Sequence, residues 1–429
     1  MIFATISLIL LGYGWGPLPH KYLKLICYIQ ELFPTSYSET IVGVPWVGLL
    51  DKGATRQLLA QTNSVASCSS SSASLVENKF EIVMPPRDVF DLQLEFAQAG
   101  LEAIVEDDVS GIFGYAPDYA RMELSRARWN RLENSPHLRA LFVFLLWFRV
   151  FILFPIRLAL LTSSFIFAAI FCIIACFYSL TNQQKTWIAV VYSRLFTAGT
   201  GLVATYHDRK NQPKQPGFAI SNHLSPNDIQ IISADVDPDR EYLYTVTGQK
   251  HGGIIWAIER LVEQLCPAMW LERNNPEERK NFTKNVINEA RRAGPVLLFS
   301  EGYCTNNTRV LQFRKAAFED EVAIYPIALK QNARFGDSFW SEDQFYIYLF
   351  RLLSSFATVY EVYYLEPQFR EPDETAEQFA ARVQSLVCEK LGVQPATFDG
   401  SLWYKKAERD KYSQVIQHKC AMQLIHLCS

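Results

Sequence analysis

The chain has 429 residues and a formal net charge of −3. Its length suggests two or three structural units, since domains typically have about 100–200 residues. The near-neutral charge argues against a nucleic-acid partner, because proteins that bind nucleic acid through bulk electrostatics carry a marked basic excess. Nine cysteines are scattered without a CxxC pair. This argues against a zinc site or a disulfide framework and favours reduced, mostly buried thiols.

The first part of the chain divides into three segments without recognisable chemistry. We expect residues 1–63 to be a membrane-associated segment, because residues 1–11 are apolar and lysines follow them. The apolar run is either an anchor whose C-terminal side is cytoplasmic or a peripherally attached end. Residues 64–74 form a Ser-rich linker. Residues 75–137 mix charged and aromatic residues, which indicates a membrane-proximal helical region.

Residues 138–182 form a hydrophobic segment. From residue 141 to residue 177 it is almost wholly aliphatic and aromatic and is broken only by Arg149, Pro155 and Arg157. The part before Pro155 is shorter than the roughly 20 residues that a membrane-spanning helix needs, whereas the part after it is long enough. Proline interrupts helices, so Pro155 and the two arginines mark a bend. Basic residues flank both outer ends, which favours a hydrophobic membrane hairpin that returns to the cytoplasmic side. A single crossing and a buried soluble core are the alternatives.

Beyond residue 183, short β-branched or aromatic runs alternate with helical stretches. We expect strands at residues 202–206, 218–221, 242–246, 268–271, 296–299, 323–329 and 358–364. The clearest helices are expected at residues 253–265, 276–292 and 375–391. This alternation predicts an α/β domain over residues 183–402, with a mixed, partly parallel sheet flanked by helices, and then a tail at residues 403–429. In such sheets, loops at the carboxyl ends of strands form the ligand site.

One such loop carries a histidine and an aspartate. The apolar run at residues 217–221 leads almost directly into His223, and Asp228 follows five residues later. Ser225 and Pro226 predict that a helix begins there, with Ser225 as its cap. Asp228 then lies in the first turn, where its carboxylate can reach the imidazole, fix its tautomer and stabilise its protonated form. This pairing is typical of a general base that acts on a hydroxyl.

A second expected strand, at residues 296–299, is followed by Glu301 and Gly302. A carboxylate just after the C-terminal end of a strand can accept hydrogen bonds from a polyol or orient a nearby cation. A glycine beside it lets the backbone approach a ligand closely. An ordinary turn after a strand is the alternative interpretation.

Four basic residues are candidates for binding phosphate. Lys250 lies just ahead of an expected helix, whose free N–H groups favour anions. Arg273 follows the expected strand that ends at residue 271, and it is the better candidate because a guanidinium binds phosphate with two donors. Arg314 and Lys315 lie beyond the Glu301 motif and can meet a larger polyanion. For each of them, a solvated surface charge is the alternative.

Three groups of residues occur in order along this domain: Asn222-His223 with Ser225, Pro226 and Asp228, then Glu301-Gly302 with Cys304, Asn306 and Asn307, then Tyr325-Pro326. Their order resembles the motifs of the glycerolipid acyltransferases. Within that superfamily, residues 205–209, residues 248–253 and residues 335–340 resemble the endoplasmic-reticulum glycerol-3-phosphate acyltransferases of types 3 and 4. The likeness covers residues 138–402, including the hydrophobic stretch.

The resemblance implies the glycerolipid acyltransferase fold and transfer of a fatty acyl group from acyl-CoA to the sn-1 hydroxyl of glycerol 3-phosphate, giving lysophosphatidic acid. It implies that His223 is the base and Asp228 its orienting carboxylate. The substrate-binding residues that it implies are Arg273 as a phosphate contact, Glu301, Gly302 and Asn306 in the acceptor site, and Tyr325 and Pro326 around the pocket. Lys250, Arg314 and Lys315 remain candidates for phosphate or coenzyme A contacts.

Two positions depart from the family pattern. Ser300 stands where the family usually has Pro, and Tyr303 stands where it usually has Thr. Because a bulkier Tyr303 can alter the size of the acceptor, a lysophospholipid or lysophosphatidic acid acyltransferase is an alternative. A catalytically inactive membrane scaffold is a second alternative, against which the retained His223 and Asp228 argue.

The expected chemistry needs no cofactor. A positioned imidazole accelerates attack by a hydroxyl by about 10²- to 10⁴-fold, and the thioester of acyl-CoA, which is a substrate, is already activated. We therefore expect no metal site. Membrane lipid is the other expected partner, and a homo-oligomer is compatible with the sequence. The expected location is the endoplasmic reticulum membrane with the catalytic domain facing the cytoplasm, and a hairpin that stays in one leaflet also permits residence on lipid droplets.

Overall fold

The structure is a computed structural model that describes residues 1–33, 111–116, 135–249, 267–271, 276–292, 294–319, 322–342 and 344–405, together with 260, 263, 407–412 and 415. The chain forms two compact units, of which the first contains Met1–Ile29 and Gly114–Ser401 and the second Gln30–Phe113 and Leu402–Ser429. In the second unit, the rings of Phe113 and Trp403 pack with their centroids 5.2 Å apart. The predicted linker at residues 64–74 and most of the region at residues 75–137 lie outside the described residues.

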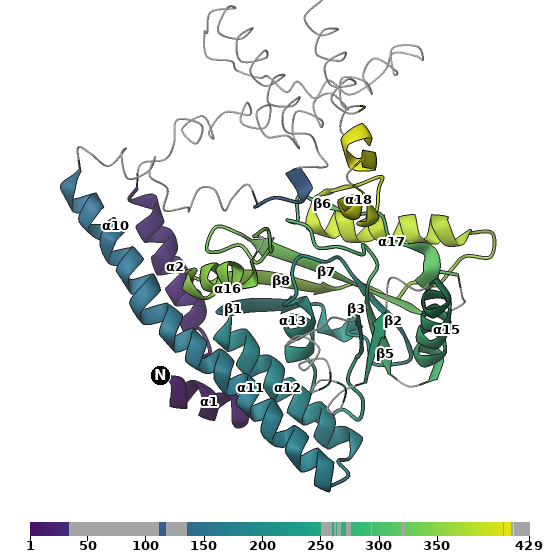
Figure 1. The fold of residues 1–429 in the computed structure, drawn as a ribbon, viewed down its shortest axis with the longest axis horizontal. Helices are drawn as coiled ribbons and strands as arrows, with labels where there is room; N and C mark the ends of the chain where they lie inside the picture. Colours follow the sequence, from purple (N-terminus) through teal and green to yellow (C-terminus); the bar gives the residue numbers. More distant parts are fainter. Residues whose placement is uncertain are drawn as a thin grey trace, which may run out of the picture. The chain divides into compact units, whose positions relative to one another are not determined.

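A seven-stranded sheet forms the centre of the first unit (Figure 1). Its strands are β1 (Leu202–His207), β2 (Gly217–Ser221), β3 (Thr245–Gln249), β4 (Ala268–Leu271), β5 (Pro295–Phe299), β7 (Ile324–Asn332) and β8 (Thr358–Tyr364). They follow the order β1-β8-β7-β2-β5-β3-β4, and every neighbouring pair is parallel except β7 and β8. A separate parallel pair joins β6 (Arg309–Val310) to β9 (Gln394–Pro395). The predicted mixed, partly parallel sheet is confirmed.

Helices cover both faces of this sheet. On one face lie α15 (Pro276–Arg292) and α17 (Ala376–Leu391), and on the other lie α12 (Asn182–Gly199) and α13 (Asp228–Ala234). Alternation along β2 explains the two layers, because Phe218 and Ile220 pack with α15 and α17 whereas Ala219 packs with α12 and α13. All three side chains are fully buried, as expected for a parallel strand in the middle of a sheet.

The local sequence explains the bounds of α17. Thr375 and Gln378 form a reciprocal capping box at its first turn, and Gly392 ends it in a left-handed conformation with φ of 72°. Between them, Phe379, Val383 and Val387 recur every four residues and are fully buried. The remaining helices and short turns of the unit include η3 (Arg209–Asn211), η4 (Lys315–Ala317) and α16 (Phe345–Ser354), and α18 (Ser401–Tyr404) begins at its last residue.

Most predicted strands and helices are confirmed. All seven predicted strands are present, although β3 begins three residues later than expected, and α15 has the predicted bounds. The helices α12 and α16 and the pair β6 and β9 were not predicted. The helix predicted at residues 253–265 falls almost wholly outside the described residues.

The hydrophobic stretch forms one long helix. It runs through α10 (Pro136–Phe148), the π-helical turn η2 (Arg149–Leu153) and α11 (Phe154–Phe177). Within the described residues it is the one helix whose length, 42 residues, and apolar composition suffice to cross a membrane. At about 1.5 Å per residue, it is about twice as long as a hydrocarbon core is thick.

The predicted reversal at Pro155 does not occur. The helix continues through Pro155 because the preceding π-helical turn rearranges the hydrogen bonds that a proline would otherwise break. The chain turns back only after Phe177, and α12 then packs antiparallel along α11, with Ile188 beside Cys172 and Gly199 beside Leu161. A membrane hairpin of the kind that the sequence suggests is thus not clearly shown.

The two arginines of this helix bind the end of α16. The Arg157 guanidinium donates hydrogen bonds to the carbonyl oxygens of Leu353 (3.0 Å), Ser355 (2.5 Å) and Phe356 (2.6 Å). Arg149 Nε donates to the carbonyl of Ser354 at 2.6 Å. Carbonyls at the end of a helix lack partners within it, so these cations cap α16. The sequence interpretation, in which both arginines mark a bend, was wrong.

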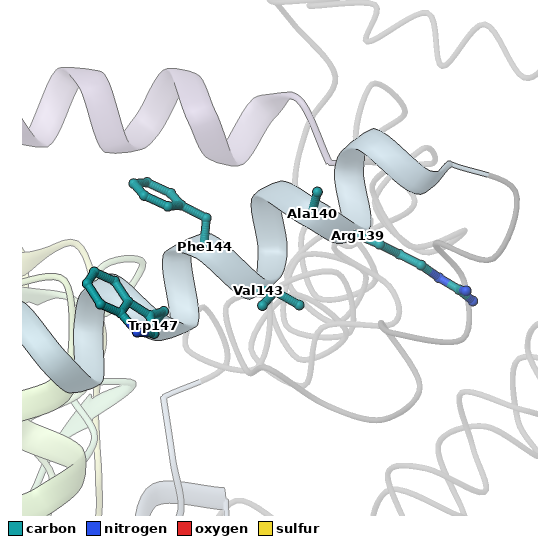
Figure 2. Close-up of a pocket in the computed structure, with 5 residues that line it drawn as sticks. All are labelled: Arg139, Ala140, Val143, Phe144 and Trp147. Carbon is teal, nitrogen blue, oxygen red and sulfur yellow. The ribbon is translucent and has the colours of Figure 1, made fainter.

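Apolar side chains project outward along the long helix. Exposed members include Val143, Phe144, Trp147, Phe151, Ile166, Ile170 and Ile173. Figure 2 shows Phe144 and Trp147 projecting from α10, with Arg139 extended away from them, around a shallow pocket of about 540 Å³. The N-terminal helix α1 (Ile2–Leu10) is much shorter than a bilayer is thick, and its Ile9 packs against Val191 and Leu195 of α12. After it, α2 (Leu18–Glu31) donates from Tyr22 to the carbonyl of Phe356.

Candidate active site

The loop after β2 is fixed by the residue that precedes His223. The Asn222 side chain donates to the carbonyl of Leu329 at 2.9 Å and accepts from the amide of the same residue at 2.8 Å. Asn222 is buried, so its amide group continues the pairing of β2 with β7 by one step beyond the strand. His223 is therefore held at the carboxyl edge of β2, in the middle of the sheet.

His223 and Asp228 form the pair that their spacing predicts. The His223 Nδ1 atom lies 2.8 Å from Asp228 Oδ2, and the Asp228 carboxylate is fully buried. This carboxylate also accepts from the amides of Leu224 and Ser225, at 2.7 Å and 3.0 Å, and from the Ser225 hydroxyl at 3.0 Å. A carboxylate held in this way orients the ring, so that Nδ1 carries the proton and Nε2 can accept one.

The helix begins two residues later than predicted. Asp228 is the first residue of α13, and Pro226 and Asn227 lie in the turn before it. Ser225 does not cap the helix as expected. Its hydroxyl instead accepts from the amide of Asn227 at 3.2 Å and donates to Asp228. This arrangement brings the carboxylate back over the turn.

The surroundings of His223 shift its pKa upward. Burial on its own lowers the pKa of the imidazole, but the sulfur of Cys304 and the hydrogen-bonded Asp228 carboxylate outweigh it, and the pKa lies well above its ordinary value of 6.5. The ring stacks on Phe299 with a centroid distance of 4.2 Å. About one fifth of the His223 side chain remains exposed. The imidazole thus has an apolar support on one side and access from outside.

Glu301 binds the main chain of the histidine. Its carboxylate accepts hydrogen bonds from the amides of His223 and Leu311, and the side chain is fully buried. Burial raises the pKa of Glu301 to about 8, against the effect of these two amides. The His223 carbonyl accepts from the amide of Thr305 at 2.8 Å. The Glu301 loop therefore holds the backbone of His223 on both its N–H and its C=O.

Gly302 and Arg314 lie together beside this loop. Gly302 has φ of 76°, and a Cβ atom there would come within 2.5 Å of the Arg314 guanidinium carbon. Arg314 Nε donates to Asp399 at 2.9 Å, and Lys315 pairs with Glu377 of α17 at 2.8 Å. Arg314 is thus next to the Glu301 loop, whereas Lys315 is engaged on the exposed surface. Arg273 and Lys250 lie outside the described residues.

The remaining predicted residues, Asn306, Tyr325 and Pro326, lie in different parts of the unit. Asn306 is buried in the Glu301 loop, where its side-chain oxygen accepts from the hydroxyl of Thr308 at 2.6 Å. Tyr325 and Pro326 lie at the beginning of β7, opposite residues 219 and 220 of β2. The Tyr325 ring contacts Gly217, the first residue of β2. Tyr325 and Pro326 thus pair with β2 four and three residues before His223.

Several supporting residues were not predicted. The Tyr360 hydroxyl lies 3.5 Å from the Asp228 carboxylate and 3.3 Å from the Ser225 hydroxyl, and it also bonds to Ser338. Tyr348 of α16 accepts from the Asn227 amide group at 3.1 Å. These contacts join residues more than 100 positions apart in the chain. The signal that could have found Ser338 was its place in the segment at residues 335–340, which resembles a family motif.

A buried Asp–His pair at the carboxyl edge of a mixed sheet, tied to a Glu–Gly loop on the next strand, defines an acyltransferase site. The family described as Acyltransferase matches residues 203–330, which contain both elements. The chain is 33% identical over 339 residues to glycerol-3-phosphate acyltransferase 3-like of Danio rerio, covering 75% of each chain.

It is also 32% identical over 338 residues to human glycerol-3-phosphate acyltransferase 4, covering 75% of this chain and 72% of that one. Among solved structures, the 1-acyl-sn-glycerophosphate acyltransferase of Thermotoga maritima matches with a TM-score of 0.40 and 14% identity, over 55% of this chain and 96% of that chain. The chain belongs to the family of glycerol-3-phosphate acyltransferases 3 and 4, as the sequence motifs predicted.

Proposed function

We propose that this chain transfers a fatty acyl group from acyl-CoA to the sn-1 hydroxyl of glycerol 3-phosphate, giving lysophosphatidic acid and free coenzyme A. The observation that carries the proposal is the contact between His223 Nδ1 and the buried Asp228 carboxylate, together with the partial exposure of the imidazole. Family membership supports the same reaction, because the relatives are named for glycerol 3-phosphate.

The reaction divides into two proton transfers at one nitrogen. Nε2 of His223 takes the proton of the glycerol hydroxyl as the oxygen attacks the thioester carbonyl, and Asp228 stabilises the resulting imidazolium. The carbon–sulfur bond then breaks, and the coenzyme A thiolate recovers the proton from Nε2. The acyl group is now an ester, and no metal or other cofactor is needed, because the thioester supplies the activated carbonyl.

The Glu301 loop has a positioning role in this proposal. Both carboxylate oxygens of Glu301 accept hydrogen bonds from main-chain amides, so this residue fixes the position of the His223 backbone. Recognition of the acceptor is then left to other groups. Arg314 lies beside Gly302 of this loop and is a candidate phosphate contact, while its Nε atom donates to Asp399. Arg273 and Lys250 keep the phosphate and coenzyme A roles that the family resemblance implies.

We also propose that the enzyme resides in the endoplasmic reticulum membrane, with the active site on the cytoplasmic side and with access to lipid droplets. The long helix α10–η2–α11 supports this, since its exposed apolar side chains suit a hydrocarbon environment. A membrane location brings the site close to acyl chains, which are poorly soluble in water.

The test is an acyl-transfer assay on membranes that contain the full chain. Labelled acyl-CoA is offered with glycerol 3-phosphate or with a panel of lysophospholipids, and we expect labelled lysophosphatidic acid. His223→Ala should lower kcat by about 100-fold or more, because the base is lost, while Lys284→Gln on the exposed face of α15 serves as a control. Product formed only from lysophospholipids would contradict the proposed acceptor, and full activity in His223→Ala would contradict the proposed base.

A further inference from the structure

A polar pocket of about 520 Å³ lies at the edge of the sheet opposite His223. Its lining residues come from α12, from the segment that joins β1 to β2, and from the segment that follows α13. The lining residues are Arg194, Arg209, Gln212, Lys214, Asp235, Val236, Asp237 and Arg240. Because β2 leads from this edge to His223, one strand length, roughly 17 Å, separates the pocket from the imidazole.

The lining of this pocket carries a surplus of positive charge. Four of its side chains are cationic and two are carboxylates, so the net charge is +2. Arg209 holds the Asp235 carboxylate with two hydrogen bonds, at 3.2 Å and 2.5 Å. That pair is neutral as a whole. Among the other lining residues, the net charge of +2 comes from Arg194, Lys214 and Arg240 against the exposed Asp237.

The two remaining arginines are oriented by the protein. Arg194 Nε donates to the carbonyl of Ala234 at 3.0 Å, and an Arg240 terminal nitrogen donates to the carbonyl of Pro213 at 2.6 Å. A guanidinium has five N–H donors, so a single bond to a carbonyl leaves others available for a ligand. Guanidinium groups that are already oriented lose less conformational freedom on binding than free ones.

The floor of the pocket is buried. The Asp235 side chain is only 4% exposed, and Gln212 beneath it is buried and donates to the Asp235 carbonyl at 3.2 Å. Burial raises the pKa of Asp235, although Arg209 opposes this effect. Charges interact more strongly in such surroundings than in open water. An anionic ligand should therefore bind more strongly in this pocket than at an equivalent cluster of cations on a flat surface.

We propose that this pocket is a second anion site, which binds a phosphomonoester away from the catalytic edge. A phosphomonoester dianion matches the charge of +2, and its oxygens match the paired donors of Arg194 and Arg240, with Lys214 as a point charge at the mouth. The ligand is either a soluble phosphate or the headgroup of an anionic lipid that ends in a phosphomonoester. This site is independent of the proposed acyl transfer.

The test measures equilibrium binding to the purified full chain in detergent. The probes are inorganic phosphate, dihexanoyl phosphatidic acid and, as a phosphodiester control, dihexanoyl phosphatidylcholine. We expect binding of a phosphomonoester probe that weakens with added salt. Binding of both phosphomonoesters identifies soluble phosphate as sufficient, and binding of phosphatidic acid alone identifies a lipid headgroup. Lys214→Gln and Arg240→Gln should each weaken it by about tenfold.

Matched controls keep this result separate from catalysis and from folding. Lys284→Gln and Arg292→Gln make the same charge changes on α15 and should leave binding unchanged. Lys214 is exposed, so Lys214→Gln should keep the thermal midpoint of the wild type. His223→Ala should bind as the wild type does.

Unchanged binding in both pocket variants would overturn the proposal. A rise in KM for glycerol 3-phosphate in parallel with the loss of binding would overturn it as well, because the pocket would then serve the substrate.

Discussion

Asp228 accepts four hydrogen bonds besides the one that it shares with His223. Two come from main-chain amides of its own loop, one from Ser225 and one from the hydroxyl of Tyr360, which is fully buried. A carboxylate with so many fixed donors cannot rotate, so it holds the imidazole in one orientation. Removing any one donor weakens this control over the ring without removing the base.

The first prediction concerns the pH dependence of the reaction. His223 must be neutral to accept a proton, and its pKa is raised well above 6.5, so the base is protonated on the acidic side and becomes active as pH rises. At saturating glycerol 3-phosphate, kcat/KM for acyl-CoA should rise about tenfold per pH unit and then level off, with a midpoint above 6.5.

Cys304→Ala provides the control for this profile. Cys304 raises the pKa of the His223 imidazole, so the variant should move the midpoint to lower pH while leaving the Asp228 contact intact. Measured rates across a pH series at constant ionic strength give both midpoints. A midpoint that stays in place in this variant would assign the titration to a group other than His223.

At the scale of elements, α16 links the long apolar helix to the active site. Arg149 and Arg157 bind carbonyls at its C-terminal end, and the Phe154 and Phe350 rings pack 5.1 Å apart. Nearer its beginning, Tyr348 bonds to Asn227 in the turn that precedes Asp228. A displacement of α16 against α11 therefore reaches the turn that positions the carboxylate.

The second prediction follows from this link. Arg157→Leu keeps the apolar character of α11 but leaves the carbonyls of Leu353 and Ser355 without their donor, and we expect a loss of unfolding free energy of about 2–4 kcal/mol. The carbonyl of Phe356 keeps the Tyr22 hydroxyl as a donor. Thermal unfolding of the detergent-purified chain measures the effect. Thr162→Val is the control on the same helix, because the exposed Thr162 hydroxyl bonds to the carbonyl of Leu158 within α11 itself. Equal midpoints for the two variants would contradict a capping role.

The strands were predictable because their sequences are short apolar, aromatic or β-branched runs, and β2 in the middle of the sheet is buried along its whole length. The helix α12 was not predicted, since it begins with the polar residues Asn182 to Lys185 and follows directly on an apolar stretch. The π-helical turn also leaves no clear signal, so Pro155 was interpreted as a bend. The sequence of α11 does not reveal that Arg157 binds a helix nearly 200 residues later.

The contact between His223 and Asp228 was predictable from local sequence alone. His223 and Asp228 are five residues apart, so local geometry alone brings them together, and Glu301 follows a recognisable strand. The roles of Tyr348 and Tyr360 depend on packing between distant elements, which no local spacing encodes. The role of Tyr325 in the pocket is implied by a family motif alone and stays a prediction, and its ring contacts Gly217, the first residue of β2.

At the scale of the whole molecule, the two ends of β2 carry two different sites. The carboxyl edge of β2 carries His223, and the edge where β2 begins carries the anion pocket. In the same unit, the exposed apolar surface of α10 and α11 needs a partner that excludes water, since an apolar surface of this size is costly in water. A bilayer meets this need.

The last prediction tests where the end of α11 lies. Cys176 is exposed in the final turn of α11, between Ile173 and Phe177, which are also exposed. If this helix enters the bilayer, a membrane-impermeant maleimide should not modify Cys176 in sealed vesicles whose cytoplasmic face is outward, but should modify it after detergent is added. Mass spectrometry of the digested chain reads the modification at each cysteine. Lys284→Cys, on the exposed face of α15, should react under both conditions, and it shows that the reagent reaches the catalytic unit. Equal modification of Cys176 before and after detergent would mean that water reaches the end of α11, and the apolar surface would then need a protein partner in place of lipid.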